Sequence, residues 1–307
     1  MKRFKTCLLV LLTLLVAASM LVSCGQKSES EATKAPSDST IASSSAPTAT
    51  STATSTENPT EVPTAAPTEE PTRAPVEVNN PPEGYNAEDK APAADLLDLV
   101  FDGETAKDGS ASQFEITALN DPVVDKDKTI NKTVAEFAKE DASMYAVYDF
   151  NSSVHDKLSD GFTFEVYVML YDDTVYSSIL GYTQAGGVSI DFDENRGSIG
   201  FGIRTPAGYV YLYDTERIDA DEYYHVVGVY NGSEISLYCD GELIKTSAAG
   251  ELVFPSVAKT YLGIGGDLSG NDQGEDQMSG TIALARIYSD ALNASQVYNL
   301  YLEAVQG

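Results

Sequence analysis

The sequence predicts an all-β domain, a sandwich of two antiparallel sheets with one short C-terminal helix. In residues 162–170 every second side chain is apolar, which predicts a strand with one buried face. The segments Tyr224–Tyr230, Ser233–Cys239 and Glu242–Thr246 are joined by the pairs Asn231-Gly232 and Asp240-Gly241, which favour the positive φ angles of type I′ hairpins. Many short strands separated by Gly-rich turns are typical of a two-sheet sandwich.

The remaining elements follow from the same patterns. Further strands are expected at residues 96–101, 113–117, 145–150, 187–192, 198–204, 208–213, 260–264 and 280–288. Asn293, followed by Gln296 three residues later, predicts the start of a helix whose apolar stripe is Val297, Leu300 and Tyr301. Residues 125–139 are expected to hold a second, short helical turn.

The N-terminus has the pattern of an export signal. Basic residues precede an apolar run from Leu8 to Val22 that falls short of the roughly 20 residues needed to span a bilayer. The run ends in Leu-Val-Ser-Cys24, which resembles the lipobox of bacterial lipoproteins and implies a lipid on Cys24. The expected protein is therefore exported and held on the cell surface by a lipid anchor in the membrane. An ordinary signal peptide with an incidental cysteine is the alternative.

A composition shift predicts three regions: a signal peptide at 1–23, a disordered linker at 24–93 and a sandwich domain at 94–307. Ten of the thirteen prolines lie before residue 93, whereas Tyr85 is the single tyrosine of eighteen there. Four proline-centred tetrapeptides follow one another from Asn58 to Arg73, which favours an extended spacer. Such a segment has too few apolar residues to fold alone.

The charge and cysteine content limit the possible partners. With 47 acidic and 19 basic residues the formal net charge is -28 at pH 7, which argues against nucleic acid as a partner. A neutral glycan, a cation or a basic protein is an easier partner. Cys7 lies in the signal and Cys24 is the expected anchor, so Cys239 alone is expected in the folded domain, without a disulfide. Because it alternates in register with Ile235 and Leu237, Cys239 is expected to be a small core residue.

Three blocks resemble the laminin-G-like, concanavalin A-like lectin/glucanase superfamily. They are Tyr223 to Leu243 with its His-Val strand and Leu-Tyr-Cys-Asp-Gly turn, Leu262 to Asp267, and Gly280 to Leu292. The opening block, Asp95 to Gly103, is similar to versions of the domain found beside metallophosphoesterases. The resemblance implies a jelly roll whose concave sheet holds sugars in many members. A tyrosine, Tyr223, replaces the usual tryptophan, and Ala283-Leu284 replaces a common Asp-Asp pair, so a ligand held by that pair is not expected.

The sequence offers little for catalysis. The glucanases of the superfamily need two carboxylates alternating on one strand, and the sequence contains no such motif. Asp191 to Glu194 is the nearest approach and is expected to be a solvated turn at a strand end. The two histidines, His155 and His225, lie far apart without a Ser-His-Asp signature, and His225 is expected to be hydrogen-bonded within the sheet. A non-enzymatic protein is predicted.

Two groups of residues are candidates for binding. Tyr209, Tyr211 and Tyr213 share one face of a strand, while Gly200, Gly202 and Arg204 share the face of the preceding strand opposite its apolar residues. Together they predict a groove in which tyrosines stack on a sugar and glycines let it approach. In the alternative, the tyrosines pack under loops or a neighbouring strand. The loop from 267 to 276 predicts a structural calcium on Asp267, Asp272 and Asp276, with a solvated charged loop as the alternative.

Three functions fit these observations. The best supported is a non-catalytic, surface-displayed module that binds a glycan. A lipoprotein for protein adhesion or scaffolding is the second, and a hydrolase of the same superfamily is the third. An open aromatic groove would favour the glycan, and a sheet covered by its own loops would favour protein contact.

Overall fold

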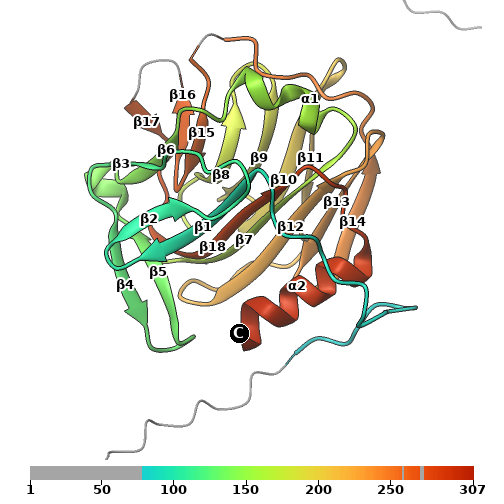
Figure 1. The fold of residues 1–307 in the computed structure, drawn as a ribbon, viewed down its shortest axis with the longest axis horizontal. Coiled ribbons are helices and arrows are strands. Elements are labelled where there is room, and N and C mark those ends of the chain that lie inside the picture. The colour runs from blue at the N-terminus through green and yellow to red at the C-terminus, as the bar shows by residue number, and fades with distance from the viewer. Residues whose placement is uncertain (1–77, 258, 270–272) are drawn as a thin grey trace, which may run out of the picture. The chain divides into compact units, whose positions relative to one another are not determined.

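The computed structural model describes residues 78–257, 259–269 and 273–307. They form two packed antiparallel sheets with one C-terminal helix, as predicted (Figure 1). None of the helices in these residues is long and apolar enough to cross a membrane.

The first sheet has nine strands in the order β14-β13-β12-β7-β18-β1-β2, with β5 beside the first part of β18 and β4 beside β5. Its strands are β1 (Leu97–Asp102), β2 (Thr105–Asp108), β4 (Val123–Asp127), β5 (Lys132–Phe137), β7 (Phe162–Leu170), β12 (Tyr223–Tyr230), β13 (Glu234–Cys239), β14 (Glu242–Ala248) and β18 (Gly280–Tyr288).

The second sheet has seven strands in the order β11-β10-β9-β8-β15-β6-β3. They are β3 (Thr117–Leu119), β6 (Met144–Val147), β8 (Ser177–Thr183), β9 (Gly187–Asp193), β10 (Ser198–Thr205), β11 (Gly208–Tyr213) and β15 (Leu262–Ile264). A separate hairpin pairs β16 (Asp267–Ser269) with β17 (Gln273–Glu275). The helices are η1 (Lys139–Asp141), η2 (Ser152–Val154), α1 (His155–Leu158) and α2 (Ala294–Gln306).

The main core lies between the two sheets. It contains the alternating apolar residues that the sequence pattern assigns to the buried faces, including Phe162, Phe164 and Val166 of β7 and Phe201 of β10. Gly228 of β12 is needed there, because a Cβ would come within 2.1 Å of the Phe201 ring. The two sheets therefore bury one face each against the other, and each keeps an outer face.

Three local predictions were wrong. Residues 125–139 hold the β4–β5 hairpin instead of the expected short helical turn, and this hairpin places Val134 and Ala135 in two different clusters on either side of the sheet. The strand expected at 113–117 begins at Thr117. The Asn231-Gly232 turn is not type I′, because Gly232 has a positive φ and Asn231 does not; the Asn231 side chain accepts from the backbone of Ser233 instead.

Helix α2 covers the outer face of the nine-stranded sheet. Val297 and Leu300 of α2 pack with Val227 and Tyr288 from that face. Residues 79–91 in turn contact α2, and Figure 1 shows this N-terminal segment running beside the helix. The Tyr85 hydroxyl donates to Asn299 Oδ1 at 2.7 Å. Part of the segment expected as linker is therefore in contact with the folded domain.

The start of α2 is fixed by the predicted capping box. The Asn293 side chain accepts from the backbone N–H of Gln296 at 3.1 Å, and the Gln296 side chain accepts from the backbone N–H of Asn293 at 3.0 Å. We expect Asn293→Ala to lower the free energy of unfolding by about 1 kcal/mol. Asn293→Ser, which keeps a capping acceptor, should lose less. Equal losses in urea unfolding of the two variants would show that the cap is not the cause.

Candidate functional site

The structure brings the six predicted groove residues together on the outer face of the seven-stranded sheet. In the register of β10 with β11, Gly200 lies opposite Tyr213, Gly202 opposite Tyr211 and Arg204 opposite Tyr209. Directly opposite residues of an antiparallel pair point to the same face. The core residues Ile199, Phe201 and Ile203 point the other way, into the sandwich.

The three tyrosines form a ladder along β11. The ring centroids of Tyr209 and Tyr211 are 5.9 Å apart at 24°, and those of Tyr211 and Tyr213 are 5.8 Å apart at 22°. Arg204 lies over Tyr209 with its guanidinium carbon 5.0 Å from the ring centroid, and Arg196 lies 4.7 Å from that of Tyr213. Each end of the ladder is therefore capped by a cation–π contact.

Arg196 is a site residue that the sequence reasoning missed. It lies in the turn after β9, and the neighbouring Asp193 carboxylate accepts from its backbone N–H at 3.1 Å. A turn residue that reaches a tyrosine on another strand leaves no periodic signal in the sequence. The clue that existed was a single arginine in an otherwise acidic turn.

The role predicted for the glycines was wrong in one respect. A Cβ on Gly202 would come within 2.1 Å of the Tyr211 ring, and one on Gly200 within 2.3 Å of the Tyr213 ring. The space above the glycines is thus filled by tyrosine edges rather than left for a ligand. The tyrosines pack on the neighbouring strand, which was the alternative, yet Tyr209 stays 43% exposed.

Beside the ladder lies a polar hollow of about 220 Å³. Tyr209 and Tyr211 line one side of it, and Asp267 of the β16–β17 hairpin lines another. Residues from two separate predictions, the aromatic groove and the acidic loop, therefore meet at one place. The rest of the lining comes from β8, β9 and their loops: Tyr176, Ser178, Thr183, Gln184, Ala185, Ser189 and Asp191.

Asp191 is the central polar group of this face, and its assignment to a solvated turn was wrong. It lies within β9 and is only 2% exposed. Burial raises the pKa of Asp191 to about 6, even though hydrogen bonds from Ser189, Tyr176 and Ser178 favour the ionised form. The Ser189 hydroxyl donates to its Oδ2 at 2.5 Å. Asp193, at the end of the strand, does accept from turn N–H groups, as expected.

Asp267 is the second carboxyl of the hollow. Burial and the nearby charges of Asp276 and Glu275 raise its pKa to about 6, against the hydrogen bond from Thr183. The Thr183 hydroxyl donates to Oδ2 at 3.0 Å, whereas Oδ1 is buried without a hydrogen-bond partner. An acidic side chain in this state is not part of a fully solvated loop.

The predicted calcium site does not assemble from the residues that can be described. Asp267 and Asp276 are near enough to interact electrostatically, but Asp272 lies outside the described residues. Within the described ranges no group of three or more His, Cys, Asp or Glu side chains is placed to hold a metal. Calcium takes six to eight oxygen ligands, so these two carboxylates alone do not fit it.

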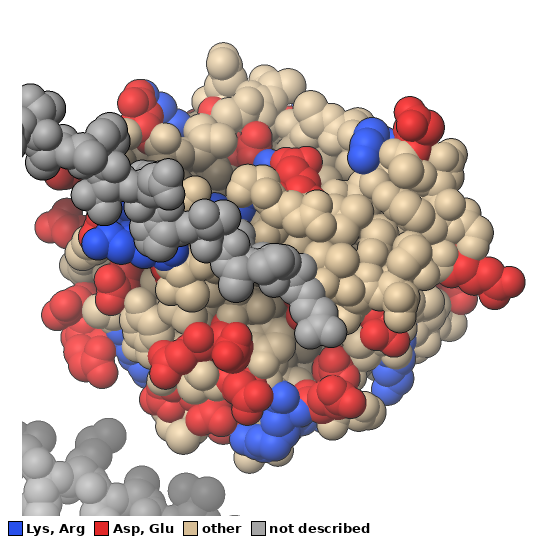
Figure 2. Space-filling model, turned by 90° about the horizontal axis from the view of Figure 1, so that it is seen from below, with Lys and Arg blue, Asp and Glu red and all other residues tan. Residues whose placement is uncertain are grey.

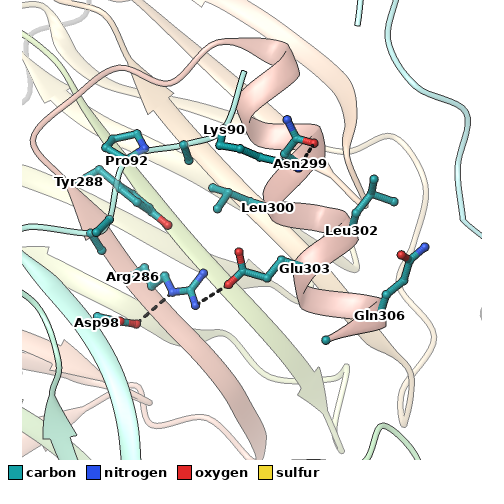
Figure 3. A pocket seen from close by; sticks show the side chains of 14 residues that line it. Lys90, Pro92, Asp98, Arg286, Tyr288, Asn299, Leu300, Leu302, Glu303 and Gln306 are labelled. Atoms are coloured by element: carbon teal, nitrogen blue, oxygen red, sulfur yellow. Dashed lines mark hydrogen bonds and ion pairs between the residues drawn. The ribbon is translucent and has the colours of Figure 1, made fainter. Parts of the chain in front are cut away.

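A larger cavity, of about 690 Å³, lies between the N-terminal segment, β18 and α2, but its charged groups are paired with one another (Figure 3). Arg286 donates to Asp98 Oδ1 at 3.0 Å and to Glu303 Oε1 at 2.9 Å. Lys90 donates to Asn299 Oδ1 at 3.1 Å. A ligand would have to replace these contacts, so the hollow beside the ladder is the better candidate.

The histidines and Cys239 have structural partners. His225 is fully buried with Nε2 2.9 Å from Glu165 Oε1, which confirms its expected role within the sheet. His155 lies 2.8 Å from the Tyr182 hydroxyl and stacks on Phe254. Cys239 packs against the core at its margin, and burial raises the pKa of its thiol, so it is a poor nucleophile.

The comparisons with known proteins agree with this fold. A family model described as "Concanavalin A-like lectin/glucanases superfamily" (Laminin_G_3) matches residues 144–298. No curated protein sequence matches the chain.

Several solved structures share the fold at 14% identity. One concerns botulinum neurotoxin type C, whose cell entry depends on two ganglioside molecules (TM-score 0.54, covering 69% of this chain and 51% of that chain). Two others are the binding domain of botulinum neurotoxin DC in complex with rat synaptotagmin II (TM-score 0.54) and with SialylT (TM-score 0.53), each covering 69% of this chain and 52% of that chain. This chain thus spans about half the length of these structures.

Proposed function

The chain belongs to the concanavalin A-like lectin/glucanases superfamily, and from that premise we propose that its sandwich domain is a non-catalytic module that binds a glycan. The tyrosine ladder and the polar hollow beside it carry this proposal. Sugar rings present apolar C–H faces together with hydroxyls, so they suit a site that combines aromatic rings with hydrogen-bonding groups. Two of the similar structures support a glycan ligand on this fold: botulinum neurotoxin type C, whose cell entry depends on gangliosides, and the neurotoxin DC binding domain in complex with SialylT.

We propose further that the module is displayed on a bacterial cell surface through a lipid on Cys24. The position of the N-terminal segment supports this display. Residues 79–91 contact α2 on the outer face of the nine-stranded sheet, whereas the hollow lies on the outer face of the other sheet. A chain that enters the domain beside α2 leaves the candidate site open.

Glycan binding is expected to depend on the ladder. Tyr211→Ala and Tyr209→Ala should each weaken binding to the preferred ligand on a glycan array by about fivefold to tenfold, because an aromatic contact contributes roughly 1 kcal/mol. Tyr171→Ala is the matched control, since Tyr171 is 38% exposed and lies outside the hollow. If both ladder variants keep their melting temperature and bind unchanged, the proposal fails.

A hydrolase is the second candidate, favoured by one observation. Asp191 and Asp267 are two carboxyl groups that line the same hollow, and glycosidases act through a pair of carboxyl groups. The 2% exposure of Asp191 and its three hydroxyl donors speak for a structural role instead. Release of reducing sugar from array-positive glycans, abolished in Asp191→Asn, would favour the enzyme over the binding module.

Protein adhesion is the third candidate. The binding domain of botulinum neurotoxin DC in complex with rat synaptotagmin II gives one instance of a protein partner on this fold. A negative glycan array together with capture of a surface protein that Tyr209→Ala abolishes would favour adhesion.

A further inference from the structure

An apolar-floored cavity of about 260 Å³ opens at one end of the sandwich, away from the hollow beside the ladder. Its floor includes Ile199, Val226 and Leu237, which belong to the main core between the sheets. Ile218 and Ile244 extend the apolar wall towards the opening. It shares no lining residue with the hollow.

The rim of this cavity is strongly acidic. Asp214, Glu216, Asp219, Asp240 and Glu242 all line it. Asp214, Glu216, Asp219 and Glu242 have no ion-pair partner among the described residues. These carboxylates act on Cys239, which also lines the cavity. Burial is the largest cause of the raised pKa of its thiol, and the charges of Asp240, Asp214, Glu242 and Glu216 raise that pKa further. A cation is the ligand charge that this rim favours.

Among the described residues that line the cavity, Arg217 is the one basic residue, and its guanidinium group lies towards Gly197 and Asp173. The Arg217 guanidinium covers Gly197, since a Cβ added to Gly197 would lie 2.2 Å from its central carbon. Arg217 Nη2 is 3.8 Å from Asp173 Oδ2. Neither Gly197 nor Asp173 lines the cavity. Among the described lining residues, five carboxyl side chains therefore face a single guanidinium group.

The acidic surface continues beyond the cavity. A neighbouring cavity of about 330 Å³ shares Asp240 and adds Asp221 and Glu222. On the face drawn in Figure 2, acidic side chains outnumber basic ones, in keeping with the net charge of -28. A partner with several positive charges would therefore meet carboxylates at more than one point.

We propose that this cavity takes the side chain of a lysine from a basic segment of a partner protein. The four methylenes of lysine would contact the apolar floor and its ammonium would meet the rim carboxylates. The cavity, of about 260 Å³, is apolar at its floor and acidic at its rim, which matches the apolar stem and charged end of a lysine side chain. An anionic group would be repelled by the rim, and a neutral apolar group would leave its carboxylates unused.

The test compares two peptides of equal charge on the purified protein by titration calorimetry at pH 6.5 and low salt. One is an acetylated, amidated tetralysine, and the other replaces each lysine by 2,4-diaminobutyrate, which has two methylenes fewer. We expect the lysine peptide to bind at least about threefold tighter, because the extra methylenes reach the apolar floor. Ile244→Phe, which fills the cavity and keeps every charge, should remove that preference.

Charge variants distinguish binding in this cavity from nonspecific electrostatic attraction of the peptide to an acidic protein. Glu216→Gln with Asp219→Asn should weaken the lysine peptide by about fivefold or more. Glu140→Gln with Asp141→Asn removes the same charge from η1, outside the cavity, and should change binding by less than about twofold. Equal affinity of the two peptides, or equal losses in the two double variants, would overturn the proposal. Tyr211→Ala should leave lysine binding unchanged, so failure of the glycan proposal would not affect this result.

Discussion

Glu165→Ala is expected to lower the free energy of unfolding by about 3 to 5 kcal/mol, the range found when one partner of a buried charge network is removed. Glu165 lies on β7 with its side chain fully buried. Its Oε1 is 2.9 Å from His225 Nε2, and its Oε2 accepts from the Tyr288 hydroxyl at 2.7 Å. Arg286 Nη1 lies 3.9 Å from the same oxygen. The alanine variant would leave a cavity and several buried donors without their acceptor.

The matched control is Glu303→Ala. Glu303 pairs with the same guanidinium of Arg286 (Figure 3), but its side chain is 59% exposed. Exposed pairs contribute at most about 1 kcal/mol, so this variant should lose little in urea unfolding. If Glu303→Ala lost as much as Glu165→Ala, burial of the network would not be the source of its stability.

The pH dependence gives a second check on Glu165. Burial alone would raise its pKa, but the hydrogen bond and charge of His225, with Arg286 and Tyr288, hold it below its ordinary value. A carboxyl with a lowered folded-state pKa stabilises the protein above its unfolded-state pKa, and this contribution is lost as pH falls through the folded-state value. The difference between wild type and Glu165→Ala should therefore shrink below about pH 4.

The strands that could be predicted from the sequence are those whose side chains alternate between apolar and polar types. The strand β7 has exactly the bounds expected from its alternating pattern, and β12, β13 and β14 form the expected meander. In these segments the neighbours along the chain suffice, because each alternate residue meets the core. The family resemblance, which rested on the same meander, is confirmed by the match over residues 144–298.

Two of the strands that were missed, β5 and β8, contain adjacent buried apolar residues, so their sequences do not alternate. Every residue of β8 but the last is buried, because the β16–β17 hairpin and Tyr176 lie on the side away from the core. The strand β5 lies between the core and α2, so Val134 and Ala135 are both buried and the alternation disappears. When a second layer comes from distant sequence, the local pattern does not record it.

The candidate site shows the same limit. The faces of Tyr209, Tyr211 and Arg204 followed from period two, and the register of β10 with β11 placed them together. Asp191 lies beside Tyr176, which precedes β8, and beside the ladder on β11. Its acidic neighbours in sequence suggested a solvated turn, and only the tertiary structure distinguishes it from them.

Asp191 is expected to make the protein less stable as pH rises from about 4 to about 6. Its folded-state pKa of about 6 lies above the ordinary value of 3.8. Between these values the folded state keeps a proton that the unfolded state has released, so the free energy of unfolding falls with rising pH. A difference of about two pKa units corresponds to roughly 3 kcal/mol, fully lost above about pH 6.

Asp191→Asn should remove this decline, so that its stability relative to wild type rises by about 2 kcal/mol between pH 4.5 and 7.5 in urea unfolding. Ser189→Ala provides the opposite change, because it removes a hydrogen bond that favours the ionised form of Asp191 and should move the decline to higher pH. Parallel stability curves for wild type and Asp191→Asn would contradict the raised pKa.

The Asp191 carboxylate lowers the stability of the fold at neutral pH, so without a functional role an asparagine at this position would give a more stable protein. If Asp191→Asn is more stable at pH 7.5 yet binds glycan more weakly, the buried charge serves the hollow rather than the fold.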